Sequence, residues 1–202
     1  GGPYNLQTMV GNYVLAPEQG VATSMGKFYD LPVFGLGGST DSKVLDQQCA
    51  SEAAISLFTA HLSGANLVHD CGFMDAGMQG SLQLMAIDND LIGFIRAATA
   101  PVEVTEETLA LDVVEELGPT GDYLAHEHTY RHFREPYYSD LADKRQYDDW
   151  LDQGGWTMEE RAAKQVEDIL AEHETEPLPE DVQQDLRAIV ERDLERVSAQ
   201  AS

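Results

Sequence analysis

The alternation of apolar and polar positions in the first part of the chain predicts helices that lead into short buried strands. Residues 18–29 carry apolar side chains at helical spacing, and an apolar run at residues 31–36 ends at a pair of glycines, as buried strands often do. The same order then recurs, with a helix expected at residues 46–62 and a strand at residues 65–68. Strands that alternate with helices indicate a parallel α/β sheet.

Further elements are expected downstream of this unit. Helices are predicted at residues 81–98 and 109–117, followed by charged amphipathic helices at residues 147–151, 158–173 and 179–197. An Asp-Asn-Asp run at residues 88–90 interrupts the apolar spacing within the first of them. Residues 123–125 are expected to form one more short strand, and residues 126–138, which are rich in His, Arg and aromatic side chains, are typical of a functional loop.

Two and a half βα units are too few for a complete fold. They can neither close a barrel nor cover both faces of a sheet, because strand edges and apolar helix faces would stay exposed. We therefore expect the chain to be a piece of a larger protein. The loop-like start at Gly1-Gly2-Pro3 fits a cut within a longer fold.

Composition favours one main domain in a reducing compartment. The chain has 202 residues, 43% of them hydrophobic, which suffices for one sizeable core. Cys49 and Cys71 lie in apolar-rich segments without repeated spacing, which argues against a disulfide framework. The N-terminus has no basic stretch leading into an apolar run, and no apolar run is long enough to span a bilayer. We expect a cytoplasmic protein.

The charge is strongly negative and uneven. The formal net charge is −24, and residues 101–202 contribute −18 of it. Such a surface repels phosphate groups, so nucleic acid and anionic membranes are excluded as partners. A salt-accumulating cytoplasm would screen the self-repulsion, and the alternative is an ordinary acidic protein with Asp- and Glu-rich helix surfaces.

Several sequence blocks resemble the trimethylamine methyltransferase family. They are LPVFGLGGSTDSK (residues 31–43), LSGANLVHD (62–70), IDNDLIG (87–93), and ETLALD (107–112) running on to LAHEHTYRHFR (124–134). The blocks occur in family order and belong to the C-terminal portion of the family, over residues 17–190. The departures are local: Asp75 stands where the family more often has Glu, and residues 1–16 match weakly.

The resemblance implies both a fold and a reaction. The implied fold is α/β, with residues 1–138 as the C-terminal portion of a TIM (β/α)8 barrel and residues 139–202 as a helical tail packed on the barrel. The implied reaction moves a methyl group from a methylated amine, bound at the C-terminal face of the barrel, to the cobalt of a corrinoid carried by a partner protein. Some family members contain pyrrolysine, whereas others act on quaternary amines such as glycine betaine. This chain contains no pyrrolysine, which favours the second group.

The loops after the barrel strands are expected to supply the site. Because a quaternary ammonium makes no hydrogen bond, its site needs aromatic faces and carboxylates. The residues expected to bind substrate are Phe34, Asp41, Lys43, Asp70, Phe73, Tyr130 and Arg131. The residues expected to be catalytic are His69, Asp75, Glu127 and His128. Lys43 or Arg131 would hold a betaine carboxylate, although salt bridging is the ordinary role for Arg131.

Two alternatives stay open at this point. The first is a zinc-dependent barrel enzyme that uses His126, His128 and His132, or His69 with Cys71, since histidines at i and i+4 share a helix face. We expect no metal, because four ligands are not visible and a histidine network explains the pattern. The second is an inactive truncated remnant that serves as a binding subunit. Its exposed strand edges would require a partner chain or a homo-oligomer.

Overall fold

The computed structural model describes the backbone of residues 17–200 and the side chains of residues 20–199. The predictions for residues 1–16, including the loop-like start, lie outside this part. The chain divides into two compact units, Gly1–Glu167 and Asp168–Ser202, and each is described by itself.

The sheet of the first unit consists of two parallel strands, as predicted. β1 (Phe34–Leu36) pairs with β2 (Leu67–His69). β1 is shorter than the predicted run of residues 31–36 but ends at the same residue, whereas β2 starts two residues later than the predicted 65–68 and ends one residue later. β1 starts only at Phe34, because Pro32 has no N–H to donate and the N–H of Val33 donates to the Asn66 side chain at 3.0 Å instead.

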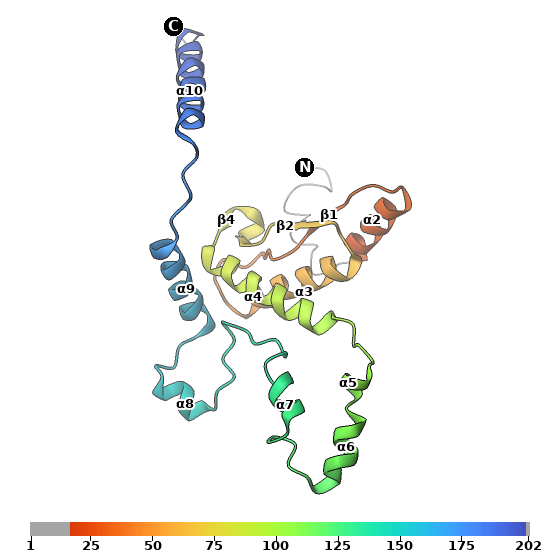
Figure 1. Cartoon of the computed structure of the whole chain (residues 1–202). Helices are drawn as coiled ribbons and strands as arrows, with labels where there is room; N and C mark the ends of the chain where they lie inside the picture. The colour runs from red at the N-terminus through yellow and green to blue at the C-terminus, as the bar shows by residue number, and fades with distance from the viewer. Residues whose placement is uncertain (1–16, 201–202) are drawn as a thin grey trace. The chain divides into compact units, whose positions relative to one another are not determined.

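A helix connects the two strands and packs against both of them. This helix, α3 (Gln47–Ser63), also contacts α2 (Pro17–Phe28) and α4 (Leu82–Thr99), as can be followed in Figure 1. The Asp46 carboxylate caps the start of α3 by accepting a hydrogen bond from the N–H of Cys49 at 3.0 Å. Gly64, in the left-handed region, ends it. The order strand, helix, parallel strand is therefore confirmed.

The helix predicted at residues 81–98 is confirmed as α4. It runs unbroken through residues 88–90, where Asp88 and Asp90, the acids that disturb the apolar spacing, are buried. Asp90 binds a later segment: its carboxylate accepts hydrogen bonds from the Ser139 hydroxyl at 2.5 Å and from the Asp140 N–H at 3.0 Å. Tyr137 donates to the same carboxylate at 3.1 Å. Polar partners inside the protein thus compensate for burial of the acid.

The core has two clusters that meet at α4. In the first cluster, Cys49 and Ala53 of α3 pack with Met74 and Leu84. The second cluster consists of Ile87, Leu141 and Ala162. The half-buried Leu91 packs against both clusters. α4 therefore lies between α3 and the start of α9 (Met158–Glu172).

A small hairpin was not predicted. It is formed by β3 (Phe73–Met74) and β4 (Gln79–Gly80), with a 3-10 turn at Asp75–Gly77 between them. Strands of two residues are too short to give a periodic pattern. Conversely, the strand predicted at residues 123–125 is wrong, since this segment is a turn whose Tyr123 hydroxyl donates to the Gly118 carbonyl at 2.9 Å.

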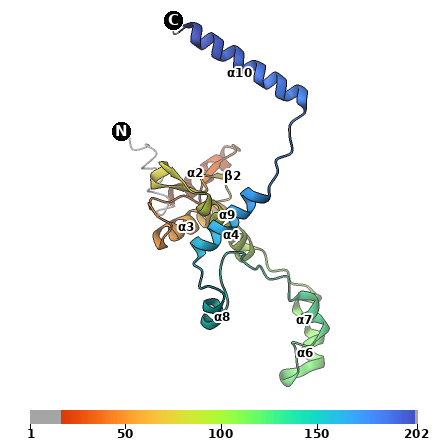
Figure 2. The ribbon, with the colours of Figure 1, turned by 90° about the vertical axis from the view of Figure 1, so that its left-hand side faces the viewer.

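The segment from residue 101 to residue 135, called the α5–α7 segment below, has almost no core. It contains α5 (Glu106–Leu109), α6 (Leu111–Leu117), a 3-10 turn (Gly118–Thr120) and α7 (Glu127–His132). Val113 is its one fully buried residue. Figures 1 and 2 show the chain passing through α5 and α6 and returning through α7. Polar contacts between these short helices, rather than apolar burial, hold the segment together.

The predicted charged helices are present. α8 (Tyr147–Asp152) and most of α9 belong to the first unit. The second unit holds the end of α9 and α10 (Glu180–Gln200), whose apolar side chains such as Leu186 and Ile189 are exposed. Among the described residues, no helix combines the length and the apolar character needed to cross a bilayer.

The fold is thus α/β and mostly helical. Residues 17–200 contain two two-stranded sheets, one parallel and one antiparallel, and no closed barrel. The predicted barrel would need strands beyond those described.

Candidate functional site

Two loops that follow the parallel strands interlock. They are residues 37–44 after β1 and residues 70–78 after β2, called the strand-end loops below. Three backbone hydrogen bonds join them: Gly72 N–H to Gly38 O at 3.1 Å, Thr40 N–H to Phe73 O at 3.0 Å, and Asp75 N–H to Ser42 O at 3.1 Å. The carboxyl ends of parallel strands share one edge, which places these two loops side by side.

Charged residues predicted from the two loops contact one another. The Lys43 ammonium lies 3.3 Å from an Asp75 carboxylate oxygen and donates to the Asp41 carbonyl at 2.7 Å. The Asp41 side chain is half-buried, and its pKa is raised by desolvation and then by the nearby Glu52 carboxylate. Lys43 is two-thirds exposed and already paired, so a ligand carboxylate would have to compete with Asp75 for it.

The aromatic and histidine residues form a second group. His69 Nδ1 lies 2.7 Å from an Asp70 oxygen, and the Phe34 ring meets the His69 ring edge-on at 5.5 Å. Phe34 is the first residue of β1, so its assignment to the following loop is wrong. Phe34 and Phe73 are 66% and 43% exposed, which leaves both rings open to a ligand.

Two acidic side chains, the half-buried Glu52 and the buried Asp88, support the strand-end loops. Glu52 of α3 accepts hydrogen bonds from the Thr40 hydroxyl at 2.6 Å and the Asp41 N–H at 2.8 Å. Asp88 of α4 accepts one from the Gly72 N–H at 2.8 Å, and desolvation raises the pKa of Asp88 to about 7. Neither residue was predicted. One feature of the sequence could have indicated Asp88: it is an acidic residue among the apolar positions of a predicted helix.

Gly38 is required where the two loops cross. Its φ is +77°, and a Cβ there would lie 2.7 Å from an Asp88 oxygen and 2.9 Å from the Cys71 sulfur. Three buried polar atoms around the crossing, Ser39 Oγ, Asp41 Oδ1 and Asp88 Oδ1, have no hydrogen-bond partner among the described residues. Such atoms are costly to bury without a hydrogen-bond partner.

The cysteines are not suited to nucleophilic or metal chemistry. Both are free thiols. Burial raises the pKa of Cys49 to about 12 and that of Cys71 to about 11, which keeps both sulfurs protonated at neutral pH. Within the described residues, His69 and Cys71 join no group of three potential metal ligands.

The third predicted group lies on α7 and contacts α5 and α6 rather than the strand-end loops. It comprises His126, Glu127, His128, Tyr130 and Arg131. His126 caps α7 by accepting the N–H of His128 at 3.0 Å, and its other ring nitrogen lies 3.7 Å from Glu116. The Arg131 guanidinium lies 2.9 Å from the Glu107 carboxylate. Arg131 thus forms the salt bridge that is the alternative to binding a betaine carboxylate.

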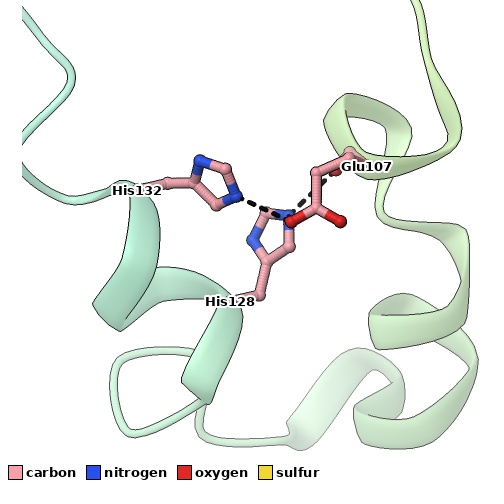
Figure 3. Close-up of side chains that lie close together, drawn as sticks. All are labelled: Glu107, His128 and His132. Atoms are coloured by element: carbon pink, nitrogen blue, oxygen red, sulfur yellow. Dashed lines mark hydrogen bonds and ion pairs between the residues drawn. The ribbon is translucent and has the colours of Figure 1, made fainter.

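A compact cluster forms where α7 meets α5. Figure 3 shows Glu107, His128 and His132 turned toward one another. The Glu107 oxygen Oε1 lies 2.9 Å from His132 Nε2 and 3.9 Å from His128 Nε2. One ligand atom from each of the three residues falls within 4.8 Å of the others. Glu107 replaces His126 in the predicted set of three histidines, and no spacing rule could have identified it.

Electrostatics favours the charged forms in this cluster. A hydrogen bond from His132 lowers the pKa of Glu107, and hydrogen bonds to Glu107 and Glu135 raise the pKa of His132. The His132 Nδ1 lies 2.6 Å from Glu135. The cluster is therefore an anion-rich site in which His132 is held between two carboxylates.

Comparison with known proteins agrees with the resemblance. The family model of trimethylamine methyltransferase matches residues 11–198. The chain is 34% identical over 187 residues to the trimethylamine methyltransferase MttB of Desulfitobacterium hafniense and 31% identical over 181 residues to that of Methanosarcina barkeri. It is 30% identical over 171 residues to a glycine betaine methyltransferase of Desulfitobacterium hafniense.

The coverage of these matches is unequal. In the order given, the three alignments cover 93%, 88% and 84% of this chain but only 38%, 37% and 36% of the relatives' own length. The chain belongs to the trimethylamine methyltransferase family and spans somewhat more than a third of the length of these relatives.

Proposed function

We propose that the protein to which this chain belongs transfers a methyl group from a tertiary or quaternary amine, of the trimethylamine or glycine betaine type, to the Co(I) of a corrinoid carried by a partner protein. Family membership supports this proposal, because both named activities of the relatives are methyl transfers from methylated amines. The observation that best supports the proposal is the pair of interlocked strand-end loops, which bring exposed aromatic rings and several carboxylates to one edge of the sheet.

The proposed architecture is the C-terminal part of a TIM barrel. In it, β1, α3, β2 and α4 are consecutive units, and the strand-end loops lie at the face where barrel enzymes have their active sites. Residues 139–202 are the proposed helical tail. The packing of Leu141 and Ala162 on Ile87 of α4 supports a tail that begins on the barrel surface.

The chain's own residues would bind and orient the amine. Phe34 and Phe73 offer ring faces to a quaternary nitrogen, which is cationic and can make no hydrogen bond. Asp41, Asp70 and Asp75 supply negative charge close by, and Lys43 would hold the carboxylate of a betaine after release from Asp75. The exposed rings also leave the loops accessible to a second protein, as the approach of a carried corrinoid requires.

Orientation matters more than strong charge pairing in this reaction. The C–N bond of the amine breaks, the bonding pair stays on nitrogen, and the positive charge disappears in the step. A site that held the charge tightly would stabilise the substrate more than the transition state. When bound, the corrinoid supplies the nucleophile that accepts the methyl group. We propose that His69, polarised by Asp70, and Asp75 line the path of the amine.

The remaining proposed residues lie on α7. Glu127 and His128 stay proposed catalytic residues, and Tyr130 and Arg131 stay proposed substrate contacts. Their role requires α7 to approach the strand-end loops in the whole protein. A homo-oligomer is proposed for the alternative in which the chain acts without the upstream barrel strands, because both edges of the short sheet then lack a neighbouring strand among residues 17–200.

The test is visible absorbance of Co(I) cobalamin mixed with the full-length protein and a panel of methylated amines. Loss of the Co(I) spectrum with one amine is expected, at a rate that falls at least tenfold in Asp75→Asn. The matched control is Asp193→Asn, an exposed acid of α10. No spectral change with any amine would overturn the proposal.

A further inference from the structure

We propose that Glu107, His128 and His132 bind one divalent transition-metal ion, with zinc the best match, and that the ion clamps α7 onto α5. This site is separate from the strand-end loops and does not depend on the methyl-transfer proposal. The donor set of two imidazoles and one carboxylate is one that zinc takes in proteins.

The positions of the donor atoms suit a tetrahedral ion. Zinc bound at the usual 2.0–2.2 Å separates its ligand atoms by about 3.4 Å. The two distances from Glu107 Oε1, 2.9 Å to His132 Nε2 and 3.9 Å to His128 Nε2, lie on either side of that value. The two imidazoles are four residues apart on α7, with ring centroids 4.4 Å apart. His128 Nε2 now bonds the Glu107 carbonyl oxygen at 2.9 Å and would exchange that bond for the ion. Small side-chain rotations would then bring all three atoms onto one ion.

One imidazole already has the outer partner that metal-bound histidines usually have. A ligating imidazole donates its second N–H to a carboxylate or carbonyl, which fixes the ring and its tautomer. His132 directs Nε2 toward Glu107 and Nδ1 toward Glu135, at 2.9 Å and 2.6 Å. With Glu135 on Nδ1 and the ion on Nε2, His132 would reproduce that arrangement, and the orientation of its ring would not change.

The surroundings favour a cation. Glu116 near His126 and Glu135 on His132 add two carboxylates to that of Glu107. Arg131 is the one competitor among the described contacts of Glu107 Oε1, at 2.9 Å. A carboxylate has two oxygens, so Arg131 can move to Oε2 while Oε1 ligates the ion.

The α5–α7 segment has a physical need for such a clamp. Val113 is its one fully buried residue, and its helices have four, seven and six residues. Helices this short are unstable without tertiary support, and exposed ion pairs contribute little. Because ligands far apart in the sequence converge only in the folded form, the binding energy of a metal adds to the stability of that form.

Binding is tested on the untagged chain after metal removal with a chelator and dialysis. Isothermal titration with zinc chloride is expected to give one ion per chain, and cobalt(II) in place of zinc is expected to give the intense visible bands of a tetrahedral site. His128→Gln and Glu107→Gln are expected to abolish both signals. Glu135→Gln is expected to weaken zinc binding by roughly 10–100-fold.

The matched control is His126→Asn, which keeps a capping acceptor at the start of α7 but lies outside the proposed set. It should bind zinc as the parent does. Circular dichroism of each variant separates loss of a ligand from loss of fold. Trypsin cleavage after Arg131 and Arg134 supplies a second readout, since zinc should slow it in the parent and in His126→Asn only.

Two results would overturn the site. One is less than one zinc ion per chain in the folded parent, with no cobalt spectrum and no protection from trypsin. The other is loss of binding in His126→Asn with retention in Glu107→Gln, which would assign the metal to a histidine-only set. Zinc stoichiometry, the cobalt spectrum and trypsin protection do not measure methyl transfer, so failure here and failure of the proposed function are distinguishable. The two proposals share only His128, which as a zinc ligand would not act on the amine.

Discussion

The strand-end loops and the α5–α7 segment both gather charged residues, but they are stabilised in different ways. The strand-end loops are joined by backbone hydrogen bonds and are supported by the half-buried Glu52 of α3 and the buried Asp88 of α4. The α5–α7 segment is joined by exposed side chains centred on Glu107. The first arrangement is rigid and intolerant of change, whereas the second is weak without an added ligand. Predictions on stability, made for the metal-free protein, follow from that difference.

The largest effect is expected where the strand-end loops cross. Gly38→Ala forces an L side chain into the left-handed region and against Asp88 and the Cys71 sulfur, at a cost of about 3 kcal/mol. Gly64→Ala at the end of α3 is the control, because Gly64 has φ +72° and ψ +37° and a Cβ there would meet only the flexible end of Lys27. It should cost about 1 kcal/mol. Urea denaturation measures both, and equal costs would mean that the loop crossing adds no clash to the cost of the backbone conformation.

A pH effect is expected from Asp88. Its pKa is about 7 in the folded protein against an ordinary value of 3.8, so between these values the folded form binds more protons than the unfolded form. Stability should therefore fall as pH rises, by about 2 kcal/mol from pH 5 to pH 7. Asp88→Asn keeps an acceptor for the Gly72 N–H and removes the titration. Thermal unfolding of both proteins across this range should show a flatter profile for the variant; parallel profiles would refute the assignment.

A smaller effect is expected from Glu52. Glu52→Gln weakens the hydrogen bonds from the Thr40 hydroxyl and the Asp41 N–H, which should cost about 1 kcal/mol. Glu115→Gln, at an exposed position of α6, serves as the control and should change stability by less than about 0.5 kcal/mol. If the two variants unfold at the same urea concentration, Glu52 does not support the loop.

The smallest effect is expected for an ion pair of the α5–α7 segment. Arg131→Ala removes a pair whose partners are both about half exposed, so the loss should be at most about 0.5 kcal/mol and should vanish at high salt. Denaturation at low and at 1 M sodium chloride measures this. A loss above 2 kcal/mol would mean that the pair is buried in the working protein.

The sequence predicts the strand, helix, strand unit well because its signals are local. The apolar runs, the Asp46 cap and the glycine that ends α3 all act within a few residues. The same locality explains the grouping of the two strand-end loops, since parallel strands must end at one edge.

The sequence fails where partners are distant or context reverses a preference. Asp88 and Asp90 disturb the apolar spacing of α4, as exposed polar residues usually do. Both are nevertheless buried, because distant segments provide their hydrogen bonds. Glu107 joins two histidines more than twenty residues away, which no spacing encodes. The family resemblance correctly identified the family but not the contacts of α7.

The binding of residues 137–140 to Asp90 has a consequence for the order of folding. Its partners are 47 to 50 residues away, whereas the bonds that join the strand-end loops span about 33 to 34 residues. On the ribosome, α3, both strands and α4 emerge first, and the Asp90 carboxylate stays hydrated until residue 140 appears. The part formed by β1, α3, β2 and α4 can thus assemble before residues 137–140 pack against it. In that late step, the Asp90 carboxylate exchanges hydrogen bonds with water for hydrogen bonds from protein donors.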